Sequence, residues 1–104
     1  LANLQTVAYG LEQGVFIMIA DQNNMITMLR DSCVSMPRME GYYLSIFSYT
    51  PCCEGITLTG VKYPLRQAKL TNWTTLGLSN EILEETAQIS VEKGTLVVVV
   101  SKDR

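Results

Sequence analysis

The chain is 104 residues long, which is the length of one small domain. Hydrophobic residues make up 47% and charged residues 17%, a composition that can bury a core and that excludes intrinsic disorder. With 8 basic and 10 acidic residues the net charge is -2, which argues against a surface for nucleic acid or anionic lipid. The sequence has no histidine, so it cannot by itself build Ser-His-Asp or Cys-His catalysis or a His-containing zinc site.

In the first part of the chain, apolar residues recur at helical spacing: Leu1, Leu4, Val7, Ala8 and Leu11. This spacing predicts one amphipathic helix over residues 1–13, with Gly14 at its C-terminal cap. No capping residue precedes the helix, and the chain opens without an initiator Met or a signal peptide. We therefore expect the chain to be a segment of a longer protein.

After Gly14 the pattern changes to short apolar segments that alternate with turn formers. Strands are expected over residues 15–20, 25–30, 42–49, 56–59, 61–65, 67–71, 87–91 and 95–101. Residues 31–41 are predicted to be a connection and residues 50–55 a loop, with turns at 21–24, 77–81 and 92–94. Because no second helical pattern separates the strands, the expected fold is mostly β, a jelly-roll-like antiparallel sandwich over 14–104 preceded by the helix.

The last expected strand is apolar on both faces, from Leu96 through Val100. A sandwich strand with one solvated face normally alternates apolar and polar residues. Either this strand is central and well covered, or its outer face meets another domain or subunit. At five residues it is, like Val15–Ala20, far shorter than the roughly 20 residues of a membrane helix, so no membrane span is expected.

The three cysteines are Cys33, Cys52 and Cys53, a number and spacing that fit neither a C-x-x-C metal motif nor a disulfide framework. This usage predicts a reducing, cytoplasmic environment. Neighbouring cysteines are poorly placed to bond to each other, so Cys52 and Cys53 are expected to be plain loop or semi-buried thiols.

Few residues mark a site by pattern alone, and neither a P-loop nor a dinucleotide fingerprint occurs. Glu81, Glu84 and Glu85 fit a solvated charged loop or an acid-base cluster. Trp73 either fills the core or offers a flat face to a ring ligand.

The tripeptide Ser79-Asn80-Glu81 brings hydroxyl, amide and carboxylate groups together at a predicted turn, after Leu76-Gly77-Leu78. Turn formation alone explains Ser and Asn at this place as well as ligand binding does. The pattern therefore leaves both roles open.

Taken in order, several segments resemble the C-terminal part of bacterial thiamine pyrophosphokinase, and the likeness runs from end to end. The segments are Leu1-Ala2-Asn3-Leu4-Gln5-Thr6, Ile19-Ala20-Asp21-Gln22-Asn23-Asn24, Gly60-Val61-Lys62-Tyr63-Pro64-Leu65, Leu76-Gly77-Leu78-Ser79-Asn80-Glu81 and the strand from Gly94 to Ser101. The resemblance implies transfer of a pyrophosphoryl group from ATP to thiamine, with Mg²⁺, giving thiamine diphosphate and AMP. It further implies a homodimer joined through the β domain.

The resemblance also implies roles for particular residues. It gives Ser79 and Asn80 a thiamine-side role, and it makes the main chain of Leu76, Gly77 and Leu78 the pocket wall. Trp73 stands where relatives often carry Gly and is added as a candidate for ring stacking. Tyr63 occupies the family's Lys-aromatic position, where a structural role is an alternative to ligand binding. No catalytic or metal-binding residue is expected in this chain.

What the chain lacks relative to the family locates the chemistry elsewhere. Relatives carry a G-G-R-x-D-[HQ] motif just before the helix that starts here at Leu1, and aspartates that organise Mg²⁺ further upstream. Residues 1–13 would then link to an absent N-terminal ATP-binding domain, which would hold most of the ATP and Mg²⁺. Phosphoryl transfer depends on positioning and on cations around the phosphates, so the chain alone is expected to be inactive. The alternative is a stand-alone β-sandwich that binds a small ligand or serves assembly without catalysis.

Overall fold

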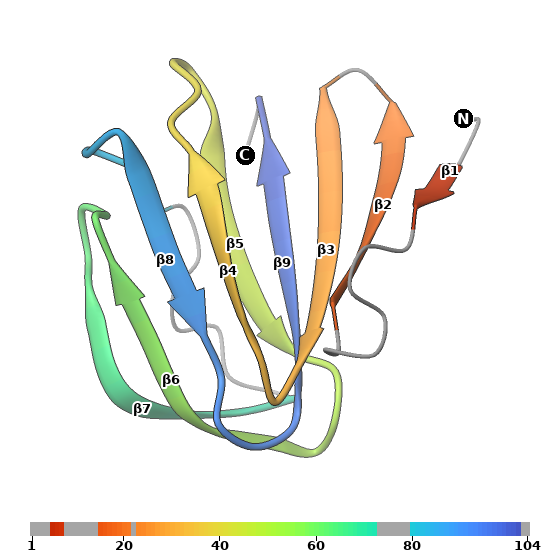
Figure 1. Cartoon of the computed structure of the whole chain (residues 1–104), viewed down its shortest axis with the longest axis vertical. Coiled ribbons are helices and arrows are strands. Elements are labelled where there is room, and N and C mark those ends of the chain that lie inside the picture. The colour runs from red at the N-terminus through yellow and green to blue at the C-terminus, as the bar shows by residue number, and fades with distance from the viewer. Residues whose placement is uncertain (1–4, 8–14, 22, 73–79, 103–104) are drawn as a thin grey trace.

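Two antiparallel β-sheets lie face to face in the computed structural model, which describes residues 5–7, 15–21, 23–72 and 80–102. Sheet A has five strands, in the order β1 (Gln5–Val7), β2 (Val15–Asp21), β3 (Asn24–Arg30), β9 (Thr95–Ser101) and β5 (Tyr43–Ser48). Sheet B has four strands, in the order β4 (Cys33–Pro37), β8 (Thr86–Ser90), β6 (Cys52–Thr59) and β7 (Leu65–Thr71). Figure 1 shows β9 between β3 and β5, although it is the last strand in the chain.

The core forms between the two sheets because the strands alternate inward and outward residues. In β9, Leu96, Val98 and Val100 are buried, whereas Val97 and Val99 are only partly buried on the opposite face. The other buried apolar side chains come from both sheets and their connections: Leu29, Met36, Leu44, Ile46, Cys53, Ile56, Leu58, Val61, Leu70, Ala87, Ile89 and Val91. The mostly β, antiparallel sandwich expected from the sequence is confirmed. Among the described residues, no helix is long and apolar enough to cross a membrane.

The expected N-terminal helix is wrong at the residues of its range that the structure describes. Gln5–Val7 form β1, which pairs antiparallel with β2 through Gln5 and Ile19, Thr6 and Met18, and Val7 and Ile17. An otherwise open strand edge supplies backbone partners, and Thr and Val favour extended structure. The rest of the range 1–13 lies outside the described residues.

Two expected connections are in fact strands. Residues 31–41 contain β4, which pairs with β8 from Cys33 opposite Ser90 to Pro37 opposite Thr86. Residues 50–55 contain the start of β6, which begins at Cys52. Pairing with a neighbouring strand outweighs the local turn tendency of Ser, Pro and Gly in both places. Conversely, residues 61–64 are not in a strand, and only Val61 forms a bridge, to Ile82.

Cys52 and Cys53 lie in the strand β6 and not in a loop, so their side chains face opposite sides of sheet B and differ in burial. Cys53 is fully buried, and its Sγ lies 3.1 Å from both Ser48 Oγ and the Thr95 carbonyl oxygen. Cys52 is partly exposed, and its Sγ lies 3.8 Å from Glu54 Oε2. The semi-buried reading holds for Cys52, whereas Cys53 is a core residue. Neither cysteine forms a disulfide, and Cys33 is also free.

Thr27 places a hydroxyl in the core without a hydrogen-bond partner in the described part of the chain. Since a buried unpaired hydroxyl costs free energy, we expect Thr27→Val to raise the free energy of unfolding by about 1 kcal/mol. Urea unfolding measures this change. Thr59→Val, at an exposed position of β6, is the matched control and is expected to shift stability by less than about 0.5 kcal/mol. A loss of stability in Thr27→Val would contradict the expectation.

Candidate functional site

The candidate site is organised around Asn80, which is fully buried and forms hydrogen bonds with two other segments of the chain and with its own neighbour Glu81. Its backbone exchanges two hydrogen bonds of 2.8 Å with Leu44 of β5. Its side-chain Oδ1 accepts hydrogen bonds from the amides of Tyr63 and Glu81, each at 2.9 Å. Its Nδ2 donates to the Tyr63 carbonyl oxygen, also at 2.9 Å. Asn80 therefore joins the edge of sheet A to the segment that leads into β7.

The segments on either side of this contact run antiparallel to each other. The Lys62 amide donates to the Glu81 carbonyl at 2.8 Å, and Val61 bridges Ile82. The Gly60 carbonyl accepts from the amides of Leu83 and Glu84, at 2.9 and 3.2 Å. We call residues 60–63 and 80–84 together the end clamp. Its backbone is held by hydrogen bonds along its whole length, so the side chains that it carries start from fixed positions.

Two side chains of the end clamp face solvent together. Tyr63 is 58% exposed, and the Lys62 ammonium lies over its ring, 5.5 Å from the centroid. This is the distance of a cation–π contact, which holds the ring from one face. An exposed aromatic ring on a fixed backbone is a common element of ligand sites, because it contributes contact area with little loss of conformational freedom.

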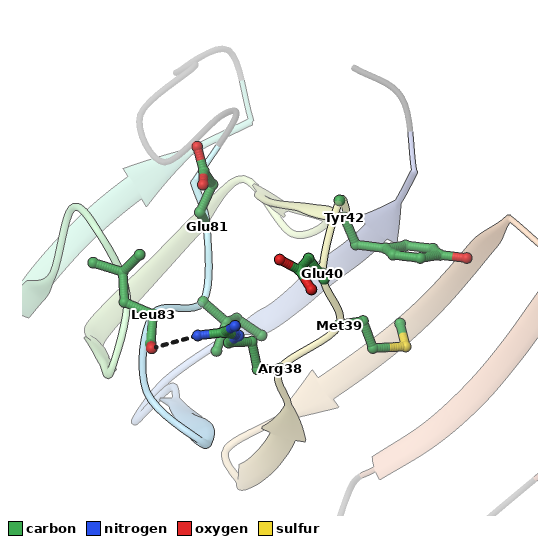
Figure 2. A pocket seen from close by; sticks show the side chains of 8 residues that line it. Arg38, Met39, Glu40, Tyr42, Glu81 and Leu83 are labelled. Carbon is green, nitrogen blue, oxygen red and sulfur yellow. Dashed lines mark hydrogen bonds between the residues drawn. The ribbon is translucent and has the colours of Figure 1, made fainter.

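A surface cavity of about 230 Å³ borders the end clamp. Its walls are the segment before β5 and the second half of the clamp: Arg38, Met39, Glu40, Gly41, Tyr42, Glu81, Ile82 and Leu83. Figure 2 shows Arg38 reaching across it, with Nη1 donating to the Leu83 carbonyl at 3.4 Å. The Tyr42 ring and the Met39 side chain point away from Glu81 and Leu83 in the same view. Glu40 and Glu81 give the cavity two carboxylates beside one guanidinium.

The structure describes one of the predicted thiamine-side residues, Asn80, and places it in the interior. The others, Leu76, Gly77, Leu78, Ser79 and Trp73, lie outside the described residues. Of the three neighbouring carboxylates, Glu84 and Glu85 are exposed and Glu81 is partly buried at the cavity. In the described ranges, no three Cys, Asp or Glu side chains gather as the ligands of a metal ion would.

Sequence reasoning missed the walls of the cavity formed by residues 38–42, which lie in a stretch predicted to be a connection. The only local signal there is a charged pair, Arg38 and Glu40, next to Gly41. It also left Tyr63 between a structural and a ligand-binding role, because the family's Lys-aromatic position does not by itself distinguish the two.

The protein is thus a two-sheet antiparallel β-sandwich that carries the end clamp and, beside it, a cavity with charged side chains. A sequence model of the family described as "Thiamin pyrophosphokinase, vitamin B1 binding domain" matches residues 31–96, which include the end clamp and the walls of the cavity. The chain belongs to this family.

Known proteins agree with this assignment. The chain is 31% identical to thiamine pyrophosphokinase from Bacillus subtilis (strain 168) over 104 residues, which are 99% of this chain and 49% of that protein. The crystal structure of the thiamine pyrophosphokinase from Bacillus subtilis superposes with a TM-score of 0.75 at 32% identity, covering 81% of this chain and 40% of that one. The Geobacillus thermodenitrificans structure gives 0.73 at 28% identity, with 82% and 40% covered. The chain thus spans about half the length of the curated relative.

Proposed function

We propose that the protein carrying this chain transfers a pyrophosphoryl group from ATP to the hydroxyl of thiamine, giving thiamine diphosphate and AMP. The observation that carries the proposal is the match to the vitamin B1 binding domain across residues 31–96, where the end clamp lies. The relatives that the chain resembles over nearly its whole length are thiamine pyrophosphokinases. In this proposal the chain supplies the thiamine side of the site.

In this proposal the thiamine side comprises the end clamp, the neighbouring cavity, Trp73 and residues 76–79. Thiamine carries an aminopyrimidine ring and a positively charged thiazolium ring, so it suits aromatic faces and carboxylates. Tyr63 supplies such a ring, and Glu40 and Glu81 supply carboxylates at the neighbouring cavity. Ser79, Leu76, Gly77, Leu78 and Trp73 are proposed to complete the pocket, as the resemblance implies.

ATP and Mg²⁺ are proposed to bind mainly in a separate N-terminal domain. The G-G-R-x-D-[HQ] motif of relatives does not occur in the sequence of this chain. Transfer between phosphates requires metal ions and positive side chains around the transferred group. This chain would bind and orient thiamine, and residues 1–13 would connect it to the domain that holds the nucleotide.

The test is to assay the longer protein and the 104-residue chain side by side with ATP, Mg²⁺ and thiamine, measuring thiamine diphosphate by chromatography. We expect turnover by the longer protein and none by the chain. Absence of turnover in both would favour a stand-alone binding or assembly module, and turnover by the chain alone would contradict the proposed division of roles.

A homodimer is proposed to form through the outer face of sheet A. Partly exposed apolar residues lie side by side there, with Met28 opposite Val97 and Ile26 opposite Val99. Phe47, opposite Val97 in β5, is 39% exposed and extends the same row. A continuous apolar face of this kind is typical of a protein interface.

We expect Val99→Glu to convert the dimer to a monomer, because a charge buried at an interface without a partner strongly disfavours association. Analytical ultracentrifugation at several concentrations measures the molar mass. Ser35→Glu, at an exposed position of β4 in sheet B, is the control and is expected to keep the dimer. An unchanged mass in Val99→Glu would place the interface elsewhere.

The protein is proposed to act in the cytoplasm. All three cysteines are free thiols, and Cys33 is exposed, as is typical of proteins in a reducing compartment.

A further inference from the structure

We propose that Asn80 is a positioning residue whose effect on thiamine is exerted through Tyr63, and that the ring of Tyr63 is the group that contacts the substrate. This inference rests on the proposed function and concerns the same site. It assigns a ligand contact to a residue 17 positions earlier in the sequence than the Asn that the motif singles out.

The hydrogen bonds of Asn80 show why its own side chain is poorly suited to hold a ligand. Oδ1 already accepts two hydrogen bonds, from the amides of Tyr63 and Glu81, and these use both of its lone pairs. Nδ2 donates one of its two hydrogens to the Tyr63 carbonyl oxygen. The residue has no exposed surface. To contact thiamine directly, this fully buried amide would have to become accessible to the ligand, which would disturb the bonds that hold the end clamp together.

The same bonds fix the backbone of Tyr63 from both sides. Asn80 contacts both the amide and the carbonyl of Tyr63, which is the pattern of a strand partner formed by a side chain. The neighbouring Lys62 is held through its own amide by the Glu81 carbonyl. The backbone of Tyr63 is therefore held in a fixed position beside Asn80, the last residue of the segment 76–80 that the resemblance assigns to thiamine.

The side chain of Tyr63 has the exposure and the chemistry of a contact residue. It is 58% exposed, and the Lys62 ammonium is the one cation over its ring among the residues that the structure describes. A burial role does not explain an aromatic residue that keeps more than half of its surface in solvent. A planar heteroaromatic ring or a cation can pack against the remaining surface of the phenol ring, and thiamine carries both.

The experiment measures KM and kcat for thiamine in the longer protein that carries this chain. We expect Tyr63→Ala to raise KM about fivefold with kcat little changed, and Tyr63→Phe to retain the wild-type KM, since the ring and not the hydroxyl makes the contact. Tyr49→Ala, at a tyrosine that is 69% exposed, is the matched control and leaves KM unchanged. An unchanged KM in Tyr63→Ala overturns the proposal.

A double-mutant cycle separates positioning from direct contact. Asn80→Ala is expected to raise KM in the wild-type background and to add little in the Tyr63→Ala background, because both changes remove the same interaction. Fully additive effects would mean that Asn80 contacts thiamine itself, and they would overturn the inference while leaving the proposed function intact. No thiamine turnover by the wild-type protein would instead overturn the proposed function, and the inference with it.

A second measurement does not depend on whether Asn80→Ala folds. Native-state hydrogen exchange of the wild-type protein reports the protection of the Tyr63 amide, which donates to Asn80 Oδ1. We expect protection as strong as that of core strand amides, because opening this bond requires the end clamp to unfold. Exchange at the rate of an exposed loop amide would overturn the positioning role of Asn80.

Discussion

Replacing Gly60 with alanine is expected to lower the free energy of unfolding by about 3 kcal/mol or more. Gly60 has a φ of +79°, which disfavours any residue with a Cβ, and a Cβ there would lie 2.5 Å from the Thr86 carbonyl oxygen. The oxygen is a backbone atom, and the backbone of residue 60 fixes the position of the Cβ, so the clash can be relieved only by disturbing residue 60 or the start of β8. The change also weakens the end clamp, because the Gly60 carbonyl oxygen accepts hydrogen bonds from the amides of Leu83 and Glu84.

Gly41→Ala is the matched control for this change. Gly41 has nearly the same φ, +82°, but a Cβ there would meet no atom within 4 Å. We expect it to cost about 1 kcal/mol, from the backbone conformation alone. The difference between the two variants in urea unfolding measures the steric part of the effect. Equal losses in the two variants would contradict the close approach of the Thr86 carbonyl oxygen to Gly60.

The other large effect is expected in the core between the two sheets. Leu96 is fully buried in β9 and is paired with Leu29 on one side and Ser48 on the other. Leu96→Ala removes buried methyl groups and leaves a cavity between the sheets, so we expect a loss of about 3 kcal/mol in unfolding free energy.

Leu83→Ala serves as the control for Leu96→Ala, since the same atoms are removed from a side chain that is 53% exposed. We expect a loss below about 1 kcal/mol there, because little surface is returned to water. Both variants are measured by chemical denaturation with the slope of the transition monitored. A Leu96→Ala loss no larger than the Leu83→Ala loss would contradict the assigned core.

The sequence predicts the strands that carry an apolar pattern of their own. The hairpin of β2 and β3, the strand β5, and the strands β8 and β9 are all found close to their expected ranges. The strand β4 was missed because it is short and has only two inward-facing apolar residues, Val34 and Met36, which are too few to mark a strand in a segment that contains Ser and Pro. Its position depends on pairing with β8, which lies some fifty residues later.

The candidate site shows the same limit. Asn80 is marked by its turn-like neighbours, yet its interior position depends on partners at Leu44 and Tyr63, and no local spacing encodes these contacts. The cavity wall formed by residues 38–42 was likewise hidden in an expected connection. The resemblance to the family supplied what periodicity could not, namely the expectation that residues 76–80 lie on the ligand side.

The position of β9 constrains the order in which the domain can form during synthesis. Among the strands that the structure describes, β9 leaves the ribosome last, yet it separates β3 from β5 in sheet A. Until it arrives, β3 lacks one of its two neighbours and β5 has no partner strand within its sheet. The nascent chain therefore holds two open strand edges that could pair with another chain, and a nonsense mutation before residue 95 would leave them permanently open.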